Sequence, residues 1–176
     1  MEAKKIIITG GATRIGAAIA RSLSGNEKQI TLHYNQSEKE AKKLKTELER
    51  DGAKVFLIKA DLSNSNSVKK IIPFSYKMMK GLDCLINNAS IFEKDSIKDF
   101  NESKFNKHMN INLKAPAILS QAFKKYVKNN KGNIVNIIDQ RIFKLTPYFF
   151  SYTLSKSGLE TLTKTSAMSL APNIRV

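Results

Sequence analysis

Short apolar runs alternate with longer segments of mixed polarity along this chain. Residues 4–9, 29–34, 54–60, 82–87 and 134–138 are mostly apolar, and each run predicts a buried strand. The segments between them predict helices at residues 16–23, 37–51, 65–80, 100–128 and 151–170, and residues 174–176 begin a sixth strand. Strands that alternate with helices predict a parallel sheet covered on both faces. We therefore expect an α/β fold, a doubly wound, Rossmann-like parallel sheet in three layers (α/β/α).

The length of 176 residues indicates one domain, residues 1–176. Since the chain stops as the sixth strand begins, we expect the domain to lack its last strands and to be incomplete at its C-terminus. No apolar run reaches the roughly 18 residues that a membrane span needs. The single cysteine, Cys84, excludes an internal disulfide, and we expect it to be buried in a cytoplasmic protein.

The formal net charge of +15 is compatible with nucleic-acid binding, with attraction of an anionic cofactor or substrate, or with a solvated lysine-rich surface. Lysines are scattered over nearly every segment, without an arginine-rich run or an aromatic-interleaved basic patch. We therefore expect no nucleic-acid partner. We also expect no metal site.

A glycine-containing turn joins the first strand to the first helix at residues 9–16. Gly10 and Gly11 permit a tight turn, and Gly16 lets the helix pack close to the strand. The helix N-terminus that follows favours a pyrophosphate, although such a turn can also be purely structural. Arg14 is a cation at the positive end of that helix, so an anion bound there would resolve the conflict.

The end of the second strand, residues 31–37, carries no acidic residue. An acid at this place would hydrogen-bond the ribose 2′-hydroxyl of NAD, so its absence favours NADP.

An acid, a phenol and an ammonium follow the fifth strand, at Asp139, Tyr152 and Lys156. Tyr152 and Lys156 are four residues apart, so on a helix both lie on one face. The ammonium would lower the pKa of the phenol, whereas a carboxylate would oppose its ionisation and keep it protonated as a proton donor. This set suits proton transfer to a carbonyl or imine during hydride transfer, although Asp139 could also be a solvated loop acid.

The same spacing recurs at Ser63, Tyr76 and Lys80. This second set follows the third strand, which is the far edge of a doubly wound sheet, and Pro73 interrupts the helix ahead of Tyr76. We therefore place the site at the later set.

Asn112 lies in the predicted long helix, four residues before Pro116. Proline has no N–H, so it leaves the carbonyl of Asn112 free to hold water, or it merely kinks the helix.

These motifs, in this order along the whole chain, resemble the short-chain dehydrogenase/reductase family. The resemblance rests on residues 9–16, Asp61-Leu62, residues 87–89, Asn112 and the Tyr152/Lys156 pair. It implies that Asn112, Asp139, Tyr152 and Lys156 are catalytic. It implies an NADP site formed by Gly10, Arg14, Ile15, Gly16, His33, Tyr34, Asn35, Ser37, Asp61, Leu62, Asn88, Ala89, Ser90, Tyr152 and Lys156. Of these, His33 is also expected to be packed inside the fold.

Several departures from the usual pattern are similar to the pteridine reductases within that family. They are Arg14 in the glycine turn, His33-Tyr34 after the second strand, Ser90 and Phe92 after the fourth, and Asp139 where serine is usual. This resemblance implies a pterin site lined by Arg14, Ser90, Phe92, Asp139 and Tyr152, with Phe92 as a stacking platform or as loop packing. Asn35-Gln36 stand where that subfamily has a basic residue.

The resemblance implies an NADPH-dependent reductase acting on a pterin-like small molecule, in a homo-oligomer formed through the predicted helices 100–128 and 151–170. A carbonyl or 3-oxoacyl reductase, or a truncated cofactor-binding remnant without activity, is the alternative. Because the resembled family continues beyond this point, we expect complete cofactor contacts on the adenine side, a nicotinamide side without its wall and lid, and a poorly covered sheet edge near the fifth strand.

Overall fold

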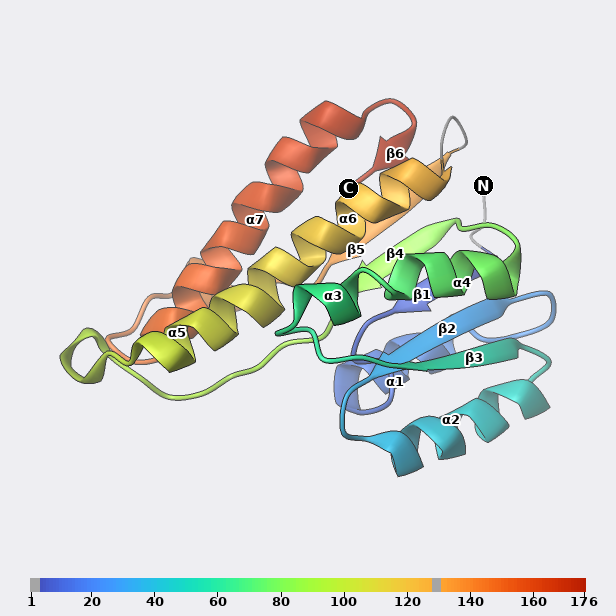
Figure 1. Cartoon of the computed structure of the whole chain (residues 1–176), viewed down its shortest axis with the longest axis horizontal. Helices are drawn as coiled ribbons and strands as arrows, with labels where there is room; N and C mark the ends of the chain where they lie inside the picture. The colour runs from blue at the N-terminus through green and yellow to red at the C-terminus, as the bar shows by residue number, and fades with distance from the viewer. Residues whose placement is uncertain (1–3, 128–130) are drawn as a thin grey trace.

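Six parallel strands form one sheet in the computed structural model, which describes residues 4–127 and 131–176 (Figure 1). Their order is β3-β2-β1-β4-β5-β6, the order of a doubly wound dinucleotide-binding fold. The bounds are β1 Lys5–Ile8, β2 Gln29–Tyr34, β3 Lys54–Lys59, β4 Cys84–Asn87, β5 Gly132–Asn136 and β6 Ile174–Arg175. The predicted fold class is therefore confirmed, and the third strand lies at the far edge as expected.

The sixth strand is present but short, since its two residues pair with Gly132 and Asn133 of β5. β5 itself begins and ends two residues before the predicted run 134–138. Gly132 joins the strand because its N–H donates to the carbonyl of Asn173 at 3.0 Å, and the chain beyond Asn136 turns toward the site.

Helices cover both faces of the sheet (Figure 1). Their bounds are α1 Arg14–Ser22, α2 Glu38–Arg50, α3 Ser65–Val68, α4 Ile71–Met79, α5 Glu102–Met109, α6 Ala115–Val127 and α7 Phe150–Leu170, with short 3₁₀ turns η1 Ile97–Asp99 and η3 Gln140–Ile142. None of the described helices is long and apolar enough to cross a bilayer.

Successive side chains of each strand point to opposite faces of the sheet, where they pack in two separate hydrophobic cores. Ile6 and Ile8 of β1 pack with α1 and α2, whereas Ile7 points to the opposite core with Leu119 and Phe123 of α6. Cys84 belongs to the first core, and its burial raises the pKa of the thiol to about 11. Val135 of β5 is only half-buried on the α1/α2 side of the sheet, so that face is less well covered near β5 than near β1.

The predicted helix 65–80 is two helices, α3 and α4, separated at Lys69-Lys70. Asn64 caps α3 by accepting the N–H groups of Asn66 and Ser67. Pro73 does not cause the break, because it lies in the first turn of α4, where a backbone N–H has no intrahelical partner.

The predicted helix 100–128 is α5 and α6 joined by a π-helical turn, η2 Asn110–Lys114. The N–H of Ala115 donates to the carbonyl of Asn110, five residues earlier, and Pro116 follows directly. The apolar stripe is correct for α6, where Leu119, Phe123 and Val127 are buried. The stripe is wrong in α5 and in the π turn. Phe105, Met109 and Leu113 are only half-buried there, and His108 is buried instead. The predicted end at Lys128 lies outside the described residues.

Candidate active site

The glycine turn is packed too closely for side chains. Gly10 has a φ of +60°, and a Cβ on it would lie 2.9 Å from the Cα of Ala89. A Cβ on Gly16 would lie only 2.1 Å from the carbonyl oxygen of Gly10. The N-terminus of α1 is thereby drawn against the turn. Its N-cap residue, Thr13, makes no side-chain capping bond, so the first N–H groups of α1 remain available to a bound anion.

A cavity of about 350 Å³ opens beside this turn. It is lined by Gly10, Thr13, Arg14, Ile15, Gly16, His33, Asn35, Asp61, Leu62, Asn88, Ala89, Ser90, Ile91 and Ile111. Most of the predicted cofactor residues therefore meet at one place, at the carboxyl ends of β1, β2 and β4. Tyr34 ends β2 and Ser37 is the N-cap residue of α2, and neither lines this cavity.

Arg14 is exposed at the rim of the cavity. It is the first residue of α1 and has a φ of 50°, in the left-handed region where a residue other than glycine is strained. Its positive charge at a helix N-terminus is unfavourable without an anion nearby. Backbone strain and charge placement thus both set Arg14 apart from an ordinary surface arginine.

His33 supports the turn from below. Its Nδ1 accepts the N–H of Gly10 at 3.1 Å, and its Nε2 lies 3.0 Å from the carbonyl oxygen of Ala60. Because a carbonyl only accepts, Nε2 carries the ring proton. Burial lowers the pKa of His33, so the ring stays neutral and this pair of bonds persists. The expected packed role is seen, although the ring also reaches the cavity wall.

Thr9 and Asn88 join the turn to the end of β4. The Thr9 hydroxyl accepts the N–H groups of Asn88 and Ala89 at 3.0 and 3.1 Å. The Asn88 amide in turn donates to the carbonyls of Thr9 and Gly10 at 2.9 and 3.1 Å.

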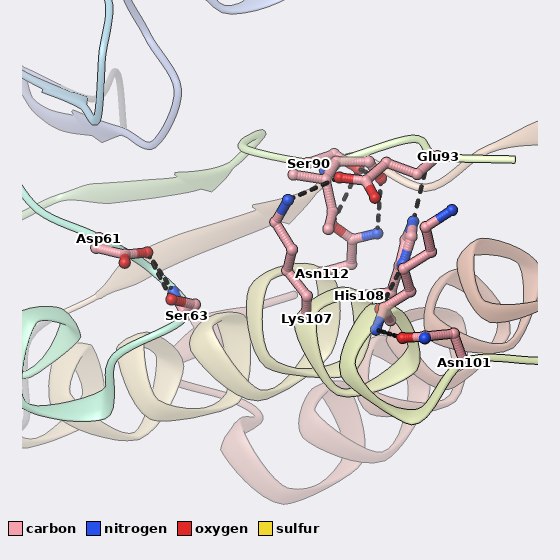
Figure 2. A network of polar contacts seen from close by, with 10 residues as sticks. Asp61, Ser63, Ser90, Glu93, Asn101, Lys107, His108 and Asn112 are labelled. Carbon is pink, nitrogen blue, oxygen red and sulfur yellow. Dashed lines mark hydrogen bonds and ion pairs between the residues drawn. The ribbon is translucent and has the colours of Figure 1, made fainter.

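Asn112 lies in the π turn, fully buried, and uses both ends of its amide (Figure 2). Its oxygen accepts the Ile91 N–H at 3.0 Å and the Ser90 hydroxyl at 3.2 Å. Its nitrogen donates to the Ile91 carbonyl at 3.1 Å and to the Ser155 hydroxyl of α7 at 3.0 Å. Asn112 therefore ties the segment after β4 to the helix that carries Tyr152, and Ser90 links this group to the cavity.

A second attachment of the same segment was not predicted. The buried His108 accepts the Glu93 N–H at Nε2 (3.2 Å), and its Nδ1 donates to the Lys104 carbonyl at 2.9 Å. Lys107 also forms an ion pair with Glu93 at 2.7 Å (Figure 2). Nothing in the sequence distinguishes His108 from a surface residue, because its position becomes buried only through the phase change at the π turn.

The acid, the phenol and the ammonium come together as predicted in space. The Tyr152 hydroxyl donates to the Asp139 carboxylate at 2.7 Å, and the Lys156 ammonium donates to the Ile137 carbonyl at 2.7 Å. Lys156 Nζ lies 5.7 Å from the centre of the Tyr152 ring. The lysine thus faces the ring and the backbone, whereas the aspartate faces the hydroxyl.

The pKa of Tyr152 is raised strongly, first by burial and then by the Asp139 carboxylate. Of the two opposing influences that the sequence indicates, the carboxylate prevails with the help of burial, so the phenol stays protonated as expected and Lys156 does not lower its pKa below the usual value. Burial lowers the pKa of Lys156 to about 8 against the pull of Asp139. Burial works to raise the pKa of Asp139, but the Arg141 N–H, the Tyr152 hydroxyl and the charges of Lys156 and Arg141 outweigh it and lower this pKa.

Phe92 is 52% exposed and stacks face to face on Phe149, with ring centres 4.2 Å apart. Its ring also meets the ring of Tyr152 at right angles at 4.7 Å. Phe92 therefore packs in its loop and presents an aromatic surface beside Tyr152, so both predicted roles are compatible with its position.

Asp95, which was not predicted, fixes the start of α7. Its buried carboxylate accepts the Ser151 N–H at 3.2 and 3.3 Å and the Ser151 hydroxyl, and its carbonyl accepts the Phe149 N–H at 2.7 Å. The N-cap residue Phe149 makes no side-chain capping bond, so an acid from a distant loop takes this role. The sequence carries no local sign of such a contact.

The second Ser/Tyr/Lys set is dispersed. The Ser63 hydroxyl donates to Asp61 at 2.8 Å, Tyr76 packs on Tyr126 with ring centres 5.0 Å apart, and Lys80 ends α4. None of the three lines the cavity. Within residues 4–127 and 131–176, no cluster of three His, Cys, Asp or Glu side chains could hold a metal ion.

A glycine turn at a helix N-terminus, together with a tyrosine and a lysine one helical turn apart at the carboxyl edge of a sheet of this order, is typical of dinucleotide-dependent oxidoreductases. The family model described as short chain dehydrogenase matches residues 4–176, and the chain belongs to this family.

Known relatives agree with this assignment. An uncharacterized oxidoreductase of Thermotoga maritima is 32% identical over 173 residues, which are 97% of this chain and 67% of that protein. The human dehydrogenase/reductase SDR family member 4 is 30% identical over 98% of this chain and 63% of its own length.

Solved structures show the same fold. The FolM alternative dihydrofolate reductase 1 of Brucella canis, complexed with NADP, has a TM-score of 0.91 and 36% identity over 97% of this chain and 70% of that chain. A short chain dehydrogenase of Burkholderia cenocepacia, also in complex with NADP, has a TM-score of 0.93 and 28% identity over 98% and 71%.

Proposed function

We propose that this chain uses NADPH to reduce a C=N bond of a pterin, with Tyr152 as the proton donor. The observation that carries the proposal is the 2.7 Å hydrogen bond from the Tyr152 hydroxyl to the Asp139 carboxylate. The NADP complexes of the Brucella and Burkholderia proteins support the cofactor, and the dihydrofolate reductase name of the former supports a pterin-like substrate.

The residues present fit a dinucleotide phosphate. The missing Cβ atoms of Gly10 and Gly16 leave room against the turn, and the uncapped start of α1 offers N–H groups to a pyrophosphate. The end of β2 presents Asn35 and no acid to the cavity, which favours NADP over NAD. When bound, the nicotinamide supplies the hydride.

The protein's own part in the reaction is to hold and deliver a proton. The raised pKa of Tyr152 keeps its hydroxyl protonated, as a proton donor for a reduction must be. Asn112 and Asp95 fix the two segments that flank Tyr152, so the phenol is preoriented.

Asp139 favours a pterin over a simple ketone. A carboxylate that accepts the Tyr152 hydroxyl can also accept hydrogen bonds from the amino group of a pterin, and Phe92 offers an aromatic surface nearby. A carbonyl or 3-oxoacyl reductase is the second candidate, because the Ser90 hydroxyl lies close enough to Tyr152 to act on its pKa and could replace the usual serine.

The test is NADPH oxidation with 7,8-dihydrobiopterin beside an acetoacetyl thioester. Tyr152→Phe should leave NADPH binding intact and lower kcat by about 10² to 10⁴-fold, whereas Tyr76→Phe, its counterpart in the second set, should change little. Asp139→Ser should reduce pterin turnover more than thioester turnover. Turnover of the thioester alone would reject the pterin and retain the second candidate.

We also propose that the protein self-associates through α6 and α7, which lie side by side (Figure 1). Leu154 and Met168 of α7 are exposed apolar residues, 43% and 75% respectively, that a second copy would cover. Light scattering of the wild type beside Met168→Glu tests this: the variant should have the lower mass, and equal masses would reject this surface.

A further inference from the structure

Arg141 follows Asp139 by two residues and lies in the 3₁₀ turn η3. Its backbone N–H donates to Asp139 Oδ1 at 2.9 Å. Its guanidinium carbon lies 4.4 Å from the ring centre of Phe149 and 5.3 Å from that of Phe92. The Phe92 ring thus contacts both the guanidinium and the ring of Tyr152.

The guanidinium has no carboxylate partner among residues 4–127 and 131–176, since none of the ion pairs there includes Arg141. Of its five N–H donors, one bonds the Thr146 hydroxyl at 3.1 Å. The Asp139 carboxylate is already engaged by the Arg141 backbone and by Tyr152. A half-buried arginine held flat against aromatic rings, with donors to spare, is suited to binding a carboxylate in a two-pronged arrangement.

A second cation, Lys94, packs on a neighbouring aromatic ring. Lys94 Nζ lies 4.8 Å over the ring of Tyr148, which is adjacent in sequence to Phe149. The cofactor phosphates do not explain Arg141, because it does not line the cavity beside the glycine turn.

We propose that Arg141 recognises a carboxylate on the substrate's tail, so that the site prefers pterins with an acidic tail, such as folates, over pterins with a neutral one. This inference rests on the proposed pterin reduction. In this role Arg141 contacts the substrate's tail and neither donates nor accepts the transferred proton, although its charge also lowers the pKa of Asp139.

The test compares two substrates that share the reduced pterin ring, 7,8-dihydrofolate with its carboxylate tail and 7,8-dihydrobiopterin with a neutral one. Arg141→Gln should raise the KM for dihydrofolate by about 10-fold or more, as expected for a lost charged hydrogen-bond pair. The KM for dihydrobiopterin should change little. Because the charge of Arg141 also lowers the pKa of Asp139, kcat should change by the same factor for both substrates. Arg141→Lys should restore part of the affinity, and Lys144→Gln, an exposed cation in the same loop, is the matched control.

An equal rise in KM for both substrates would show that Arg141 only holds the Phe92 and Phe149 rings in place. This result would overturn the inference and leave the proposed function standing. Calorimetry with dihydrofolate and with dihydrobiopterin, each added to the NADP complex, tests the role of Arg141 separately from the proposed pterin reduction. Arg141-dependent binding of dihydrofolate without turnover would reject the proposed function and support the role of Arg141. Binding of neither ligand would overturn both.

Discussion

The carboxylate of Asp95 accepts hydrogen bonds from both the backbone N–H and the hydroxyl of Ser151, 56 residues further along the chain. Ser151 directly precedes Tyr152, so the loop after β4 sets the position at which the catalytic helix begins. The same loop is bound to Asn112 and His108, and it presents Ser90 and Phe92 to the site. Tyr152 and the aromatic surface of Phe92 are therefore held as one unit.

We predict that Asp95→Ala lowers the free energy of unfolding by about 1 to 3 kcal/mol, because it leaves the buried donors of Ser151 without an acceptor. It should also lower kcat while the affinity for NADPH is retained, because Asp95 does not line the cavity beside the glycine turn. Urea denaturation and steady-state kinetics measure the two effects.

Asp95→Asn is the control for this prediction, because its amide oxygen still accepts a hydrogen bond and should restore part of both losses. In a double-mutant cycle, Asp95→Ala and Ser151→Ala should be strongly non-additive. Additive losses would mean that the contact does not position Tyr152.

A second prediction concerns the pH dependence of stability. Burial lowers the pKa of Lys156 from 10.5 to about 8, so the folded state disfavours the charged form. The unfavourable contribution is fully present below pH 8 and is relieved as the pH rises from 8 to 10.5, where the unfolded chain binds more protons. Lys156→Met should therefore have a higher free energy of unfolding than the wild type. The difference should be largest at pH 7 and should shrink toward pH 10.5.

Lys164→Met, on the exposed side of the same helix, is the matched control, and its effect should be small at every pH. Urea midpoints of the three proteins between pH 7 and 10 suffice for the comparison. If the difference in urea midpoint between the wild type and Lys156→Met stayed constant across this range, the lowered pKa of Lys156 would be contradicted.

The third prediction concerns the glycine turn. Gly16→Ala would place a methyl group 2.1 Å from the Gly10 carbonyl oxygen and 2.7 Å from the Asn88 amide, so α1 must move away from the turn. We expect NADPH affinity to fall by about 10-fold or more, which corresponds to about 1.4 kcal/mol. Fluorescence titration with NADPH measures it.

Ala18→Gly, on the exposed side of α1, separates this effect from general loss of helix stability. It costs the helix about 1 kcal/mol in propensity but adds no atom to the turn. If both variants weakened NADPH equally, the close approach at Gly16 would not be the cause.

Features that depend on local pattern were predictable from the sequence, and features that depend on distant partners were not. The strand runs, the glycine turn and the four-residue spacing of Tyr152 and Lys156 each have a local signature. Asp95 has none, because its role depends on a helix that begins 55 positions later in the chain.

The direction of the pKa shift of Tyr152 was not predictable from local pattern either. The sequence indicates two opposing influences on Tyr152, the ammonium and the carboxylate, but it does not say which lies closer to the hydroxyl. Only the fold, which turns Lys156 toward the Ile137 carbonyl and Asp139 toward the phenol, determines the direction of the pKa.

The π turn at Asn110–Lys114 joins α5 and α6 into one continuous helix and changes which side of that helix is buried (Figure 1). An α-helix rotates by about 100° per residue, so the one surplus residue of a π turn offsets the buried sides of α5 and α6 by that amount. His108 can therefore face the loop after β4 while Leu119 and Phe123 face the sheet. As a result α5 holds the loop after β4 in place and α6 packs in the core, although the backbone passes between them without a loop.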